Sequence, residues 1–126
     1  MSTGTHTNVK EALDHVRAAG QELHAAINDA AAKQSGATKA DLEAFAQKAK
    51  SVAQSLKSSI STQEGAARKA LMEAASELET SQKQAIEGLK ASGEAFQNSM
   101  REAVRGARAS VQKINEAVAA ARSKAS

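Results

Sequence analysis

Apolar residues recur along this chain at helical spacings, first every seven residues and later every eleven. Between residues 9 and 30 the steps alternate between four and three, which is typical of a helix that packs along another helix. Gly20 takes one of these positions, and glycine there lets a partner approach closely at a cost of about 1 kcal/mol in helix propensity. The large apolar residues of this first-helix seam are Val9, Leu13, Val16, Leu23 and Ile27.

The first helix is expected over residues 9–34. Residues 1–8 are small and polar without periodicity, so we expect a flexible arm there. Asn8 supplies a side-chain oxygen for an N-cap, and Glu11 follows three residues later, as in a capping box.

A turn is expected over residues 35–38, because Gly36 is a typical C-cap residue and a second capping signal follows it. That signal is Thr38 with Asp41 three residues later. Since connections this short place two helices side by side, the chain should run back antiparallel to the first helix.

Beyond this turn the apolar period becomes eleven residues, or three helical turns of about 3.67 residues each, so the apolar positions stay on one face. We therefore expect a long amphipathic helical segment over residues 39–122, followed by a tail at 123–126. The larger residues on this face, called the apolar stripe below, are Phe45, Val52, Leu56, Leu78, Leu89, Phe96, Met100, Val111 and Val118.

Kinks or turns are possible within this segment near residues 61–65 and 88–93. Ser61 to Glu64 matches a capping box before Gly65, and glycines cluster at the second place. The fold is all-α in either case: an elongated hairpin if the segment is continuous, or an up-down bundle of four helices if both places break.

The composition indicates that the core is poor in large side chains. Alanine occupies 30 of 126 positions, whereas Leu, Ile, Val and Phe together occupy 19. Cys, Pro, Trp and Tyr are absent, which excludes a disulfide scaffold, a thiol nucleophile and an aromatic platform for stacking nucleic-acid bases. We expect a marginal monomer that completes its fold by self-association or against an apolar surface.

No group of residues predicts catalysis, a cofactor or a metal site, and we expect no enzyme. His15 and His24 are nine residues apart and lie half a turn out of phase, so they cannot share a metal ion. The densest carboxylate group is residues 73–79, where Lys69 lies four residues before Glu73. This spacing is typical of exposed ion pairs that support a helix.

Positive charge is concentrated near the C-terminus of a chain whose net charge is only +3. Arg101, Arg105 and Arg108 form a basic stripe beside the apolar face, which suits an anionic surface or a few DNA phosphates. Cations near a helix C-terminus also complement the helix dipole, so the stripe is compatible with a purely structural role.

The chain contains no apolar run approaching about 18 residues, the length that suggests a transmembrane helix. Its N-terminal residues lack the cationic start and apolar core of a signal peptide. We therefore expect no transmembrane segment and a cytoplasmic location.

The stretch from Thr38 to Arg122 resembles the phasins, helical proteins that coat bacterial polyester storage granules. The resemblance rests on an Ala, Gln, Ser and Lys-rich composition and on phrases such as Ala44-Phe45-Ala46-Gln47-Lys48-Ala49 and Gly93-Glu94-Ala95-Phe96-Gln97. It implies surface coating, a cytoplasmic location, oligomerisation and no catalytic residues. The chain also resembles small uncharacterised helical proteins of proteobacteria, and it departs from phasins in its short length and few Leu and Phe residues.

Three functions follow as hypotheses from these patterns. The first is a non-enzymatic protein that binds a hydrophobic granule or lipid-like surface through its apolar stripe and self-associates. The second is a structural homo-oligomeric helical bundle, or a module that binds a protein partner. The third is weak, sequence-independent binding of nucleic acid through the basic stripe.

Overall fold

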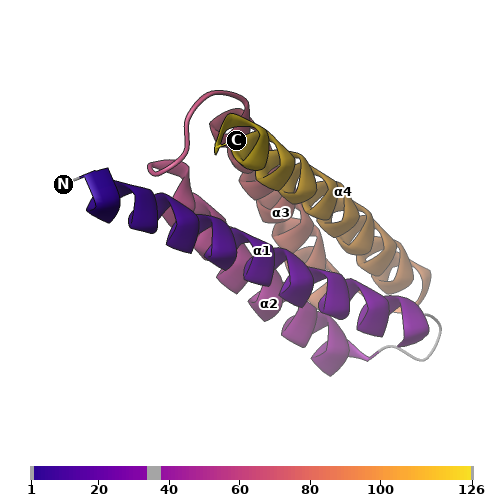
Figure 1. The fold of residues 1–126 in the computed structure, drawn as a ribbon. Coiled ribbons are helices and arrows are strands. Elements are labelled where there is room, and N and C mark those ends of the chain that lie inside the picture. Colours follow the sequence, from indigo (N-terminus) through magenta and orange to yellow (C-terminus); the bar gives the residue numbers. More distant parts are fainter. Residues whose placement is uncertain (1, 34–37, 126) are drawn as a thin grey trace.

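The computed structural model describes residues 2–33 and 38–125, with side chains described for residues 13–33 and 38–121. This part of the chain forms four helices and no strand. The helices run alternately up and down, and both termini lie at the same end of the bundle (Figure 1). The predicted all-α fold is confirmed, in its four-helix form, with α1 at Ser2–Lys33, α2 at Lys39–Ile60, α3 at Gly65–Leu89 and α4 at Gly93–Ala125.

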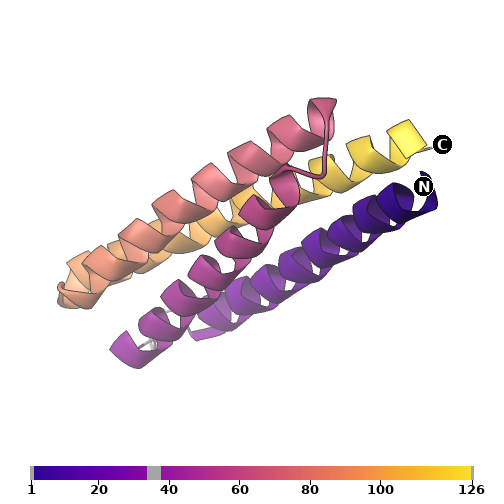
Figure 2. The ribbon, with the colours of Figure 1, turned by 90° about the vertical axis from the view of Figure 1, so that its left-hand side faces the viewer.

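The four helices form a ring in sequence order. α2 packs between α1 and α3, α4 packs against α3, and α4 also contacts α1 and so closes the ring. Figure 2 shows the α1–α2 hairpin beside the α3–α4 hairpin, with the connection between them at the end that carries both termini. Each helix therefore has two neighbours that can cover an apolar face.

The first helix is longer than its sequence pattern predicts. α1 begins at Ser2, so residues 2–8 are helical and Asn8 lies inside the helix, where a flexible arm and an N-cap were expected. Once a helix has formed, each further residue adds a hydrogen bond, and Ser, Thr and Asn lower helix propensity by at most about 0.7 kcal/mol. The same reason applies to the predicted tail, because α4 continues to Ala125.

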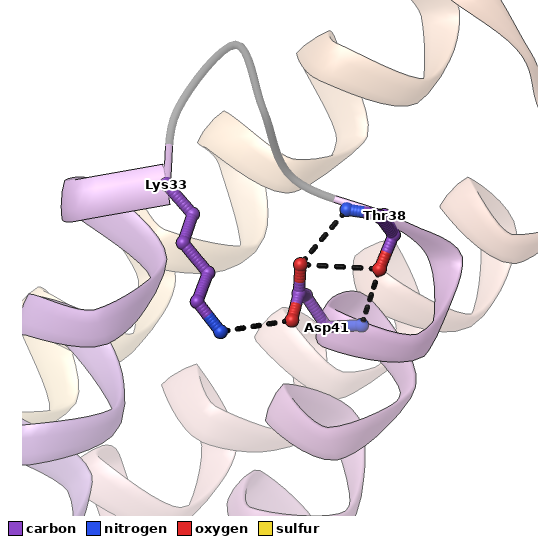
Figure 3. A network of polar contacts seen from close by, with 3 residues as sticks. All are labelled: Lys33, Thr38 and Asp41. Atoms are coloured by element: carbon purple, nitrogen blue, oxygen red, sulfur yellow. Dashed lines mark hydrogen bonds and ion pairs between the residues drawn. The ribbon is translucent and has the colours of Figure 1, made fainter.

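The start of α2 confirms the predicted capping box (Figure 3). The Thr38 hydroxyl accepts a hydrogen bond from the Asp41 backbone N–H at 3.3 Å, and Asp41 Oδ2 accepts one from the Thr38 N–H at 2.9 Å. Lys33 Nζ, at the end of α1, lies 2.9 Å from Asp41 Oδ1. Residues 34–37, which hold most of the predicted turn, lie outside the described residues.

Hydrogen bonding at this junction changes the pKa of both charged groups. The backbone N–H of Thr38 and, next, the Lys33 ammonium hold the pKa of the Asp41 carboxyl below its ordinary value. Its hydrogen bond to Asp41 raises the pKa of Lys33 in turn. The charged forms of both side chains therefore stabilise the α1–α2 junction.

The long segment after Thr38 is interrupted at both places where the sequence shows weak points. α2 ends at Ile60 and α3 begins at Gly65, while α3 ends at Leu89 and α4 begins at Gly93. Gly65 and Gly93 have φ of 60° and 58°, in the left-handed region where glycine is favoured. The predicted capping box at Ser61 does not form: the N-cap of α3 is Glu64, which makes no side-chain capping hydrogen bond.

The core contains mainly small side chains. Among the described side chains, 25 apolar residues are buried, and 13 of them are alanines. Large apolar side chains that remain exposed are Met72 and Ile86, both on α3. None of the described helices combines the length and apolarity needed to span a membrane.

Candidate functional site

The apolar stripe faces the interior of the bundle, where the helices of the same chain cover it. The neighbouring helices of the same chain therefore cover the stripe, whereas the sequence pattern led us to expect a partner outside the chain. Six residues of the apolar stripe are buried, namely Phe45, Val52, Leu56, Leu78, Phe96 and Met100. The other three are partly buried against the same core, namely Leu89, Val111 and Val118.

The first-helix seam also faces the core. Val16, Leu23 and Ile27 are buried, Leu13 is half-buried, and the side chain of Val9 lies outside the described residues. A Cβ atom added at Gly20 would lie 3.0 Å from Cγ2 of Ile114 on α4. Gly20 therefore allows the close helix contact that the sequence predicts, and the partner is the last helix.

The α3–α4 interface is built from small residues that sequence reasoning missed. The Ser81 hydroxyl donates a hydrogen bond to the carbonyl oxygen of Ala103, and the Ser110 hydroxyl donates one to the carbonyl oxygen of Ala74. A Cβ atom added at Gly106 would lie 3.1 Å from the Cβ of Ser81. The signal in the sequence is a set of small residues at helical spacing, such as Gly106 and Ser110, four residues apart.

A groove of about 740 Å³ lies between the C-terminal part of α1 and the N-terminal half of α4. Its floor, called the groove floor below, consists of Ala30, Ala31, Met100 and Val104. The three arginines of the basic stripe line it together with Gln97 and Glu102. The structure thus brings the predicted basic stripe beside Ala30, which ends the seven-residue pattern of the first helix, and Ala31, which lies outside that pattern.

The groove lies on the same α1–α4 seam as the close contact at Gly20. The helices run antiparallel, and Gly20 lies against Ile114 where they are close. Ten residues further along α1 and ten back along α4, this register places Ala30 opposite Val104. Both of these residues line the groove, which therefore lies ten residues from the close contact along each helix.

The basic stripe carries positive charge that is largely uncompensated. All three arginines are exposed. The only ion pair that any of them makes with a described residue joins Arg105 Nη1 to Glu102 Oε1 at 3.8 Å, and the Arg105 side chain remains 82% exposed. Farther along α4, Lys113 is neutralised by Glu73 at 3.0 Å and Glu116 at 3.4 Å. The groove therefore carries two arginines without an ion pair to a described residue and a third in a long, exposed pair.

The carboxylates considered as candidate chemistry take part in ion pairs between helices. Glu73 pairs with Lys113 of α4, and Glu79 pairs with Lys57 of α2 at 3.0 Å, in place of lysines on their own helix. The hydrogen bond from Lys113 lowers the pKa of Glu73, and the bond from Glu73 raises the pKa of Lys113. These side chains connect neighbouring helices at the partly exposed surface.

Acidic and histidine side chains in the described part of the chain do not gather into a group that could hold a metal ion. His15 and His24 are both exposed on α1. The features with functional potential are therefore the alanine-rich core, the apolar stripe within it and the groove between α1 and α4. No protein-family model, no curated protein and no solved structure matches this chain.

Proposed function

We propose that this protein is a non-enzymatic amphipathic helical protein that binds an apolar or lipid-like surface by opening its bundle. In the closed state the apolar stripe forms the core, and in the bound state the same stripe faces the surface. The observation that carries this proposal is the composition of the core, in which 13 of 25 buried apolar residues are alanines. The resemblance to phasins points to the same kind of function.

An alanine-rich core lowers the free energy needed to open the closed state. Burial of one methyl group contributes about 0.8 kcal/mol, whereas a Leu, Ile or Phe side chain contributes about 1.5–3 kcal/mol. The stripe is shielded from water in both states, because the neighbouring helices cover it in the closed state and the external apolar surface covers it in the bound state. The helices keep their own backbone hydrogen bonds in either state, as amphipathic helices at an interface do.

The α1–α4 seam is the place where opening should begin. No hydrogen bond or ion pair joins α1 to α4 among the side chains described in residues 13–33 and 38–121, and the groove occupies part of this seam. The α3–α4 interface, by contrast, has two buried hydrogen bonds, from Ser81 and Ser110, and an ion pair between Lys113 and Glu73.

A disulfide across the α1–α4 seam tests the proposal. A Cβ atom at position 20 would lie 3.9 Å from the Cβ of Ile114, which fits the usual disulfide range of about 3.5–4.5 Å. The chain has no cysteine, so Gly20→Cys with Ile114→Cys gives a single engineered bridge. The bridge would close the ring of helices covalently.

The measurement is co-flotation of the protein with phospholipid-coated triacylglycerol droplets. We expect the unmodified protein and the reduced double variant to float with the droplets, and the oxidised double variant to remain in solution. The reduced form of the same variant is the matched control for the two substitutions. Equal flotation of oxidised and reduced forms would contradict opening, and failure of the unmodified protein to float would contradict surface binding itself.

The proposal includes a cytoplasmic location and self-association on the bound surface, both implied by the resemblance to phasins. The closed bundle has little apolar surface for self-association, because Met72 and Ile86 are the large apolar side chains exposed in its described part. We therefore expect one chain per particle in sedimentation without a surface. A stable oligomer under these conditions would favour the structural homo-oligomeric bundle instead.

A further inference from the structure

We propose that the groove between α1 and α4 binds a single-chain amphiphile with an anionic headgroup. The acyl chain would lie along the groove floor, and the headgroup would meet the basic stripe. This site is present in the closed bundle, so it goes beyond the proposed surface binding and does not depend on opening.

The dimensions of the groove fit such a ligand. Its volume of about 740 Å³ is within the range of about 300–1,000 Å³ that is usual for small-molecule sites. The part of α4 that lines it extends from Gln97 to Arg108, or about 16 Å at 1.5 Å per residue. A groove bordered by about 16 Å of α4, with alanine methyl groups on its α1 side, suits an extended acyl chain.

The charge of the groove selects the headgroup. Three guanidinium groups face one carboxylate, Glu102, among the lining residues, and the α1 side contributes only Ala30 and Ala31. A guanidinium can donate two parallel hydrogen bonds to a carboxylate or phosphate oxygen pair. Positive charge on one edge of an apolar floor therefore complements a ligand with one anionic end.

Duplex DNA fits the same surface less well. Proteins that bind DNA through its backbone make about 6–10 phosphate contacts, and the basic stripe has three cations. The next basic residue of α4, Lys113, is occupied by Glu73 and Glu116. The apolar floor would also have no role in phosphate binding.

Methionine methyl NMR can locate the ligand, because the chain has only three methionines and, of the two whose side chains are described, Met100 lines the groove. Met72 is exposed on α3 and serves as an internal control. The probes are dodecanoate below its micelle concentration, neutral dodecyl maltoside, inorganic phosphate and a short DNA duplex. We expect dodecanoate to shift the Met100 methyl signal saturably without moving that of Met72, and the other three probes to bind at least tenfold more weakly.

A triple substitution of the basic stripe to glutamine, Arg101→Gln, Arg105→Gln and Arg108→Gln, should weaken dodecanoate binding at least tenfold. The matched control is Arg68→Gln, Lys69→Gln and Lys83→Gln, which removes the same charge from exposed positions of α3. This control should change the affinity less than twofold.

Three outcomes would overturn the proposal. Equal affinities for dodecanoate and dodecyl maltoside, or equal losses in the two triple variants, would show that the basic stripe does not bind the headgroup. Simultaneous shifts of Met72 and Met100 with loss of cooperative unfolding would show a detergent effect. Stronger perturbation of Met100 by DNA than by dodecanoate would assign the stripe to nucleic acid. None of these outcomes bears on flotation of the locked variant.

Discussion

The hydroxyl of Ser110 on α4 donates a hydrogen bond of 2.8 Å to the carbonyl oxygen of Ala74 on α3, and the Ser110 side chain is completely buried. A second buried hydroxyl, that of Ser81, crosses the same interface in the opposite direction to Ala103. Each serine thus satisfies its polar group within a close contact between two helices. The side chains between α3 and α4 are small and their hydroxyl groups are hydrogen-bonded, so the two helices can approach closely.

We expect Ser110→Ala to lower the free energy of unfolding by about 1 kcal/mol, the usual contribution of one hydrogen bond. Ser110→Val should lower it by about 1–3 kcal/mol, because two methyl groups must enter a space that holds one hydroxyl. Urea unfolding followed by circular dichroism measures both. Ser58→Ala is the control, since the Ser58 hydroxyl bonds the Ser55 carbonyl on an exposed face. A valine variant as stable as the alanine variant would contradict close packing.

Gly88→Ala should destabilise the bundle, although alanine is the better helix former by about 1 kcal/mol. The new Cβ atom would lie 2.6 Å from Cδ2 of the buried Leu42 and 2.9 Å from the Cβ of Ser99. We expect a net loss of about 1–3 kcal/mol in the free energy of unfolding, measured in urea. Addition of Ser99→Gly removes one of these contacts and should restore part of the stability. A stabilised Gly88→Ala variant would show that the three helices do not meet closely there.

The hydrogen bonds of the Asp41 carboxylate predict how the stability of the bundle depends on pH. Because the folded state lowers the pKa of Asp41, its contribution to stability is complete above the unfolded value of about 3.9 and is lost as pH falls through the folded value. Lys33→Gln should raise the pKa of Asp41 only part of the way to its ordinary value, since the Thr38 N–H bond remains. Carboxyl carbon NMR titration measures this shift. An Asp41 carboxyl that titrates at its ordinary value in the unmodified protein would contradict the network.

Thr38→Ala tests the other half of this capping box. The substitution removes the hydroxyl that accepts from the Asp41 N–H and should lower the free energy of unfolding by about 1 kcal/mol. Urea unfolding at neutral pH measures the loss, and Thr38→Ser, which keeps the hydroxyl acceptor, is the control. Equal losses in the two variants would show that the hydroxyl does not cap α2.

The sequence pattern was sufficient to find the inward faces, because burial follows the helical period wherever the chain is helical. It was insufficient to count the helices. Leu56 and Ala67 lie eleven residues apart on either side of one turn, and Leu89 and Met100 do the same across the other. Since both turns are short, the apolar phase continues through them, and a continuous helix gives the same spacing.

The groove could not be predicted from local spacing, because it depends on a contact between the first and last helices. Ala30 and Val104 are 74 residues apart, and the place of Ala30 at the end of the seven-residue pattern does not show which helix it faces. The basic stripe was recognisable, since its three arginines repeat at helical spacing. What it faces depends on how α1 packs beside α4, which results from packing of the whole bundle.

Leu78→Ala should have opposite effects on stability and on the rate of surface binding. Leu78 is completely buried, so its truncation should lower the stability of the closed bundle by about 3 kcal/mol. At about 1.4 kcal/mol per tenfold change, this raises the population of the open state on the order of 100-fold. If opening precedes binding, adsorption to triacylglycerol droplets, followed by interfacial tension under conditions where the variant remains folded, should accelerate by a similar factor. Glu79→Gln removes only a partly exposed pair with Lys57 and should change the rate less than twofold. A Leu78→Ala protein that is less stable but adsorbs no faster would mean that the core does not have to open before the surface is bound.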